Sequence, residues 1–350
     1  MDHIGIDVHK RESQICIETE DGEIIEQRIR TERERFEAVF GRRPRAKILI
    51  EAMTESEWVA RCLEDLGHEV IVADPNYAAM YATRSRRVKT DRRDAVTLAD
   101  ACRLEAYRVS HRASDRQRHV RAELAVRDTL VRTRVRCVAL VGALLRRHGV
   151  HLPSGNVDGF VARVERQSMP EQQRAEIAPL LTLIRTASAE VDAADERVAT
   201  IAAADPVIQR LRTVPGVGPL TATAFVATLD TRERFAGPHE VEAYLGLTPS
   251  EMSSGEKQHR GAITKAGNSR ARWLLVEAAW CILRSRHSDT EHLRQWAERI
   301  ALRRGRRIAT VALARRLAGI LYAMWRDGTE YDPRRRVHPR GAQVPASAVA

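Results

Sequence analysis

Four acidic residues stand where a carboxylate is costly or has a close acidic neighbour. Asp7 lies inside the apolar run IGIDV, and Glu51 ends the apolar run ILIE. A carboxylate in an apolar strand is unfavourable unless a cation or a donor satisfies it. Asp91 and Asp94 lie three residues apart in KTDRRDA, and a helix would place them on one face. If the four carboxylates converge in the fold, they could bind two Mg²⁺ ions. One ion would activate the attacking oxygen of a phosphodiester reaction, and the other would stabilise the leaving oxygen.

A structural interpretation of the pair in KTDRRDA is also open. Asp91 could cap the start of a helix, and Asp94 could pair with Arg92, Arg93 or another nearby arginine. Each acid alone is weak evidence, and their combination favours the metal site.

Two glycine-containing segments downstream could contact phosphate groups. Gly216 and Gly218 in VPGVGP lie between two predicted helices, where glycine allows a close approach to phosphate and the next helix offers free N–H groups. This predicts a helix-hairpin-helix that binds DNA backbone, with a plain helix–helix connection as the alternative. Residues 249–267 form a polar and basic stretch that we expect to be irregular chain. Its basic residues include Lys257, Arg260 and Lys265.

The same stretch contains Ser253 and Ser254, followed by a glycine. A serine hydroxyl among cations could attack a phosphate, because positive charge stabilises both the alkoxide and its target. Serines in polar loops are more often simply solvated, so the residues alone leave this role open.

The elements that must position these residues alternate between strand and helix over residues 1–105. This alternation predicts an α/β domain, and three antiparallel strands that feed βα units favour a ribonuclease-H-like or RuvC-like fold. The expected strands are 3–9, 13–20, 22–30, 46–51 and 69–73, and the expected helices are 31–40 and 56–66, with two more helices at the end of the domain.

The remainder is predicted to be all-α. Residues 106–205 carry two runs of apolar residues at seven-residue spacing, which predict a long antiparallel helical hairpin of coiled-coil type, suited to spacing domains or to dimerisation. An ordinary helical subdomain is the alternative. Residues 206–330 form a helical domain, and 331–350 a basic disordered tail. The heptad positions are Leu124, Val131, Val138 and Leu145 in the first run, and Ile177, Ile184, Val191 and Val198 in the second.

Composition limits the class of protein. The chain has 350 residues, with 58 Lys and Arg against 47 Asp and Glu, a net charge of +11 that favours a nucleic-acid partner. No apolar run approaches the roughly 20 residues of a membrane span, and the start has no apolar signal core, so a cytoplasmic location is expected. Five dispersed cysteines indicate neither a zinc ribbon nor a disulfide framework.

In the order of its motifs, the chain resembles the DEDD transposases of bacterial insertion sequences, the Piv-related "one-ten" class. The motifs are IGIDVHK, ILIEA, KTDRRDA, a helical middle, PGVGPLTA and SSG…RGAITKAGN. The resemblance implies that Asp7, Glu51, Asp91 and Asp94 are a RuvC-like metal-binding tetrad and that Ser254 is a nucleophile. It further implies a covalent serine–DNA intermediate, a site assembled from different subunits of a dimer or tetramer, a structured bridge RNA as guide, and work at the bacterial nucleoid.

Two departures from the family pattern bear on the site. After Glu51 the family has a Thr-Gly pair and an aromatic residue, whereas this chain has Met53 and Thr54 before ESEW. Ser253 beside Ser254 leaves the choice of nucleophile open, with the spacing to the glycine favouring Ser254. The alternatives are a RuvC-like metal-dependent junction-resolving nuclease that uses water, and a non-catalytic nucleic-acid-binding protein.

Overall fold

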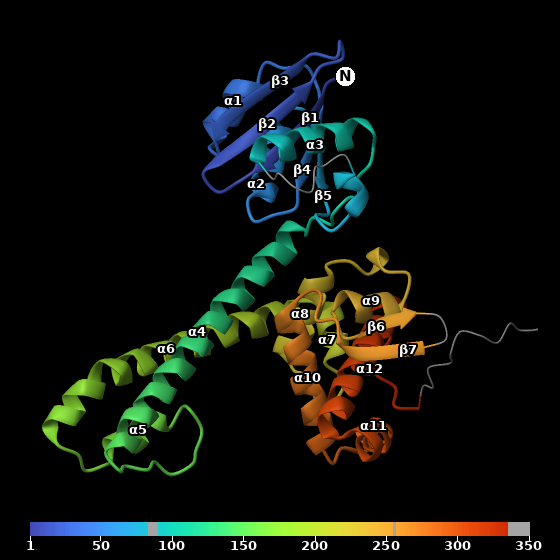
Figure 1. The fold of residues 1–350 in the computed structure, drawn as a ribbon. Coiled ribbons are helices and arrows are strands. Elements are labelled where there is room, and N and C mark those ends of the chain that lie inside the picture. The colour runs from blue at the N-terminus through green and yellow to red at the C-terminus, as the bar shows by residue number, and fades with distance from the viewer. Residues whose placement is uncertain (83–89, 255–256, 335–350) are drawn as a thin grey trace, which may run out of the picture. The chain divides into compact units, whose positions relative to one another are not determined.

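The computed structural model describes residues 1–82, 90–254 and 257–334, without the side chains of 252–260. The chain divides into two compact units, Met1–Ala113 and Ser114–Ala350. The first is a mixed α/β unit, and the second is mostly helical (Figure 1). The predicted α/β domain followed by a mainly helical remainder is therefore confirmed at this level.

The first unit is built on one five-stranded sheet in the order β3-β2-β1-β4-β5. β1, β2 and β3 form the predicted antiparallel meander, while β1–β4 and β4–β5 pair in parallel. The elements are β1 (His3–Val8), β2 (Glu12–Glu18), β3 (Ile24–Arg30), α1 (Arg33–Phe40), β4 (Lys47–Glu51), α2 (Ser56–Asp65), β5 (Glu69–Ala73), the 3₁₀ turn η1 (Ala78–Tyr81) and α3 (Asp91–Arg103).

Strand alternation divides β1 between two cores. Ile4 and Ile6 pack on one face of the sheet with α1 and α2, through residues such as Phe36. Gly5 lies on the opposite face, which α3 covers (Figure 1). Asp7, two residues beyond Gly5, therefore belongs to the α3 face.

Gly5 sets the distance between β1 and α3. A β-carbon at this position would lie 2.2 Å from the carbonyl oxygen of Ala95 and 2.2 Å from the amide nitrogen of Ala99. Both atoms are helix backbone and cannot move aside, so only glycine lets α3 lie this close to the strand. The close packing brings the start of α3 to the end of β1.

We expect Gly5→Ala to destabilise the first unit by about 2–3 kcal/mol, because α3 must move away from the sheet. Urea unfolding followed by circular dichroism measures the change. Gly237→Ala is the control, since a β-carbon there meets nothing within 4 Å. Equal unfolding midpoints for Gly5→Ala and the wild type would contradict this explanation of the packing.

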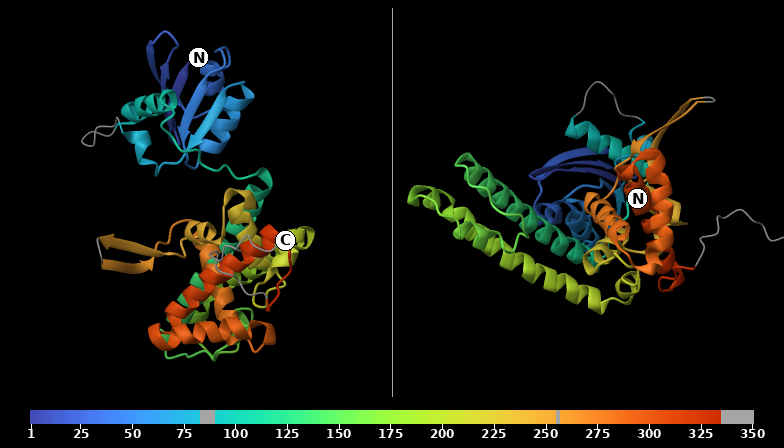
Figure 2. Two further views of the ribbon diagram at one scale, coloured as in Figure 1. Left: turned by 90° about the vertical axis from the view of Figure 1, so that its right-hand side faces the viewer. Right: turned by 90° about the horizontal axis from the view of Figure 1, so that it is seen from below.

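The second unit combines a long helical hairpin with a compact group of helices. α4 and α6 lie side by side along the hairpin (Figures 1 and 2), and the predicted heptad residues of α6 are all buried, from Ile177 to Val198. The helices are α4 (Asp115–Arg147), α5 (Phe160–Glu165), α6 (Glu171–Ala204), α7 (Pro206–Leu211), α8 (Pro219–Leu229), α9 (Pro238–Tyr244), α10 (Ser269–Arg284), α11 (Glu291–Arg304) and α12 (Arg306–Asp327), with 3₁₀ turns η2 (Arg232–Arg234) and η3 (Ser288–Thr290).

α12 is the central helix of the compact group. Leu313, Leu317 and Leu321 are fully buried in its core. By length and composition α12 is the one candidate membrane span among the described residues, and 56% of its most apolar window is buried inside the unit. That burial is typical of a helix in the core of a folded domain.

Part of the stretch predicted as irregular chain is a β-hairpin. β6 (Pro249–Ser254) and β7 (Lys257–Ile263) pair antiparallel and project from the helices (Figure 2). The irregular-chain prediction was wrong here because PSEMSS and KQHRGAI lack the alternation of apolar and polar residues that marks a half-buried strand.

The expected tail begins in ordered structure. Tyr331 donates its amide N–H to Thr213 Oγ1 and its hydroxyl to the carbonyl of Asp289. Residues 335–350 lie outside the described residues.

Candidate metal centre

Two neighbouring parallel strands end in an acidic residue. The register pairs Ile6 of β1 with Ile50 of β4, so Asp7 and Glu51 are the next residues along the two strands. Glu51 follows Leu49 by two residues, and Leu49 packs in the core that α3 shares. Alternation thus places both acids toward the face covered by α3.

α3 supplies the other two acids in its first turn. Its N-cap is Thr90, whose hydroxyl accepts a hydrogen bond from the Arg93 amide, and Arg92 is paired with Glu26. The proposed capping role for Asp91 is therefore wrong, because Thr90 already fills it. Asp91 and Asp94 still gain from the positive end of the helix dipole, which favours acids there.

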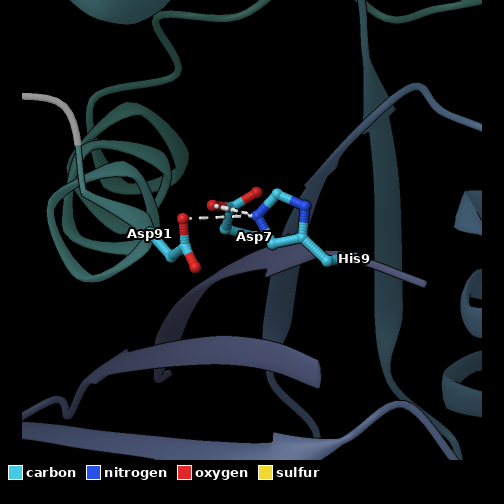
Figure 3. A group of neighbouring side chains, drawn as sticks. All are labelled: Asp7, His9 and Asp91. Carbon is cyan, nitrogen blue, oxygen red and sulfur yellow. Dashed lines mark hydrogen bonds and ion pairs between the residues drawn. The ribbon is translucent and has the colours of Figure 1, made fainter. Parts of the chain in front are cut away.

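One ring nitrogen of His9 faces two of these carboxylates (Figure 3). Its Nε2 is 3.2 Å from Asp7 Oδ2 and 3.5 Å from Asp91 Oδ1. One candidate ligand atom from each of the three residues lies within 4.8 Å of the others. The Asp7 side chain is only 12% exposed, whereas those of His9 and Asp91 are about half exposed. The group is thus open to solvent on one side.

The centre makes ionisation of Asp7 unfavourable. Burial raises the pKa of Asp7 from its ordinary 3.8 to about 6, while His9 lowers it. The negative charges of Asp94, Asp91 and Glu51 each raise the pKa of Asp7 further. The other three predicted acids therefore all lie close enough to interact with Asp7. A bound cation would offset both the cost of burying the charged Asp7 carboxylate and its repulsion by the other acids.

The structure also identifies two residues that the sequence analysis did not assign to the site. His9 stands two residues after Asp7, directly beyond the end of β1, and that spacing was the available signal. Tyr81 donates its hydroxyl to Glu51 Oε2 at 2.8 Å. Tyr81 lies 30 residues from Glu51, and its contact had no signal in the sequence. Glu51 and Asp94 lie outside the close group of three that includes His9.

The glycines of VPGVGP have different surroundings. Gly216 has φ +96°, and a β-carbon there would meet Ile282 at 3.0 Å, so glycine is required for packing on α10. Gly218 is the N-cap of α8, and a β-carbon there would meet nothing within 4 Å. The start of α8 has no side-chain cap. Gly218 is thus the glycine with room for a ligand beside it.

The serine-containing stretch is described mainly by its backbone. Ser254 is the last residue of β6 and pairs with Lys257 in the hairpin register. Lys265 has a positive φ of 57° and an exposed side chain. The side chains of Ser253, Ser254, Lys257 and Arg260 lie outside the described residues.

An α/β unit that carries a carboxylate centre, joined to a basic helical unit, is the architecture of a class of proteins that process phosphodiesters. Comparison with known proteins specifies the family. An IS110-type DEDD transposase model, described as "Transposase", matches residues 4–149, and the model "Transposase IS116/IS110/IS902 family" matches residues 208–295. The chain belongs to the IS110 family of DEDD transposases.

Relatives of similar length carry related names. The chain is 26% identical to "Transposase for insertion sequence element IS1111A" of Coxiella burnetii, over 92% of this chain and 88% of that protein. It is 28% identical to "Probable family 20 transposase" of Pseudomonas aeruginosa, over 95% and 99%. It is 26% identical to "Transposase for insertion sequence element IS1328" of Yersinia enterocolitica, over 94% and 98%.

Proposed function

We propose that this protein is an insertion-sequence transposase that cuts and rejoins DNA strands at a divalent-metal centre. The observation that carries the proposal is the convergence of Asp7, His9 and Asp91 within 4.8 Å, with Glu51 and Asp94 close enough to raise the pKa of Asp7. The two family models together cover the proposed site residues. Ser254 falls in the match over 208–295, and the acids fall in the match over 4–149.

The donor set suits Mg²⁺, which prefers carboxylate oxygens. Asp7 is the central ligand, with Asp91, Asp94 and Glu51 around it, and four carboxylates are sufficient for the two ions expected in this class of site. When bound, such ions supply positive charge at the attacking and leaving oxygens of a phosphodiester. Tyr81 orients Glu51 by donating its hydroxyl to it. The pKa of about 6 means that Asp7 ionises just below neutral pH.

Ser254 is the proposed nucleophile. Its hydroxyl oxygen forms a bond to phosphorus, the bond to one deoxyribose oxygen breaks, and the hydroxyl proton is transferred to that leaving oxygen. The covalent serine–DNA ester keeps a phosphodiester-like bond that a DNA hydroxyl can later attack, so the strand is rejoined without an external energy source. The family resemblance and the position of Ser254 beside Lys257 in the hairpin support this assignment.

The proposed partners are DNA at the ends and target of the element and a structured bridge RNA. A net charge of +11 supports partners of this kind, and the family resemblance supports the RNA. A dimer or tetramer in the bacterial cytoplasm follows from the same resemblance.

The finer fold assignments belong to the proposal as well. The strand order β3-β2-β1-β4-β5, with only β2 antiparallel to its two neighbours, supports a ribonuclease-H-like or RuvC-like first domain. Gly218 at the uncapped start of α8 supports a helix-hairpin-helix over α7 and α8. Four parts with boundaries near 105, 205 and 330 remain the proposed domain division.

Metal removal tests the proposed function. We expect protein stripped with EDTA to leave DNA of the element junction uncut, since four clustered carboxylates repel a phosphate without a cation. Added Mg²⁺ should restore strand cleavage, measured on a sequencing gel. Full cleavage in EDTA would contradict a metal-dependent centre.

His9 should influence which metal binds. Mg²⁺ takes oxygen ligands, whereas imidazole nitrogen favours transition metals. We therefore expect His9→Gln to weaken Co²⁺ binding by about tenfold or more and to change Mg²⁺ binding less. The Co²⁺ absorption spectrum, titrated without DNA, gives the affinity directly. Unchanged Co²⁺ affinity and spectrum would exclude His9 as a ligand.

A further inference from the structure

The corner between α11 and α12 is an exposed basic surface. Every residue of 302–308, with the sequence LRRGRRI, is exposed. Leu302 is 88% exposed, the highest value among the large hydrophobic residues that the structure describes. We call this surface the arginine corner and define it by Arg299, Arg303, Arg304, Arg306 and Arg307.

The arginine corner lacks the ion pairs that neutralise many other arginines of the chain. Arg112 pairs with Glu57 and Glu64, and Arg127 pairs with Asp195. Within residues 1–82, 90–254 and 257–334, none of the five corner side chains is in an ion pair with a described acid. Glu298 precedes them directly and is not paired with them either.

Arg303 and Arg304 stand in the last turn of α11, where the helix dipole favours cations, but other parts of this accumulation of charge are unfavourable for the fold. Arg299 and Arg303 are four residues apart on α11, a spacing at which like charges repel. Arg306 and Arg307 stand in the first turn of α12, where the helix dipole disfavours cations. Burial, and then the nearby charge of Arg299, lower the pKa of Arg316, which lies over the Trp296 ring. Positive charge therefore continues along the α11–α12 pair beyond the corner itself.

We propose that the arginine corner binds the phosphate backbone of duplex DNA. Phosphates would supply the negative charge that the protein does not, and arginine forms two parallel hydrogen bonds to a phosphate. The exposed aliphatic side chains of Leu302 and Ile308 flank the arginines and could pack against the sugar–phosphate backbone. The inference rests on the proposed function, because it assigns a DNA contact to the helical unit of the proposed transposase.

The test removes four of the charges together. Arg303→Gln, Arg304→Gln, Arg306→Gln and Arg307→Gln are combined in the full-length protein, and binding to a labelled 30-base-pair DNA duplex is measured by fluorescence anisotropy between 50 and 300 mM NaCl. Each lost phosphate contact should reduce the slope of log affinity against log salt by about 0.9, so we expect a reduction of roughly three to four.

A matched control removes four arginines that are paired with acids. It combines Arg28→Gln, Arg45→Gln, Arg185→Gln and Arg197→Gln, with the same loss of net charge. Its salt slope should stay near that of the wild type, and both variants should keep the wild-type unfolding temperature.

The outcomes distinguish failure of the arginine-corner inference from failure of the proposed function. Equal slopes for the corner variant and the control overturn the inference and leave the transposase assignment standing. If the corner variant loses affinity for an RNA duplex of the same sequence but not for the DNA duplex, the inference is also overturned. No binding of DNA by the wild type would contradict the proposed function itself.

Discussion

Replacing Asp7 with asparagine is expected to abolish strand cleavage and, at the same time, to stabilise the metal-free protein at neutral pH. Asp7 is the most buried acid of the centre and interacts with the other three. In the proposed metal centre, removing its charge removes the central ligand. A metal contributes several kcal/mol to such a reaction, so the rate should fall by about 10³-fold or more.

The stability effect follows from the raised pKa. Asp7 has a pKa of about 6 in the folded protein against 3.8 ordinarily, so the folded state holds the proton more tightly than the unfolded state. The stability that protonated Asp7 contributes is complete below pH 4 and is lost as the pH rises through about 6. At pH 7.5 the loss is at most about 3 kcal/mol. Asparagine never ionises, so the variant avoids this loss.

Urea unfolding in EDTA at pH 4 and pH 7.5 measures the effect. Asp7→Asn should exceed the wild type in free energy of unfolding at pH 7.5, and the difference should shrink at pH 4. Asp91→Asn is the control, because Asp91 is half exposed and its replacement should lose cleavage with little change in stability. A destabilised Asp7→Asn at pH 7.5 would show that Asp7 is satisfied by the protein rather than by a metal.

Ser254→Ala is expected to abolish recombination and the covalent protein–DNA adduct while sparing DNA binding. In the proposed mechanism the hydroxyl oxygen of Ser254 bonds to phosphorus, and alanine has no such oxygen. Loss of a nucleophile that works with other groups costs on the order of 10⁴-fold or more. Recombination of a junction plasmid, scored by polymerase chain reaction, and anisotropy binding measure the two properties separately.

Ser253→Ala is the matched control one residue away. If Ser254 is the nucleophile, this variant keeps the adduct and most of the recombination. The reverse pattern would move the nucleophile to Ser253. Retained recombination in both single variants and in the double variant would refute serine catalysis.

Much of the candidate centre was predictable because strand alternation and helix spacing are local properties. IGIDV and ILIE identify two strands by apolar content, and an acid in each marks the exception. The heptad residues Ile177 to Val198 are buried as expected, because one seam must face α4. Spacing in KTDRRDA likewise put Asp91 and Asp94 on one turn of α3.

Other features depend on contacts that no local pattern encodes. Gly5 is required only because α3, some 90 residues later, lies against it. The segments PSEMSS and KQHRGAI lack the alternation of apolar and polar residues that reveals a strand. Tyr81 reaches Glu51 through the fold alone. His9 was visible in the motif, but its interaction with Asp91 required the position of α3.

The most direct test of metal-dependent covalent strand exchange is a denaturing gel. Purified protein, the RNA transcribed beside its gene and end-labelled junction DNA are incubated with Mg²⁺ or with EDTA. We expect labelled DNA to migrate with the protein in Mg²⁺, and this adduct to be absent in EDTA and in Ser254→Ala. Cleaved DNA without any adduct would contradict this expectation and indicate a hydrolytic nuclease that uses water.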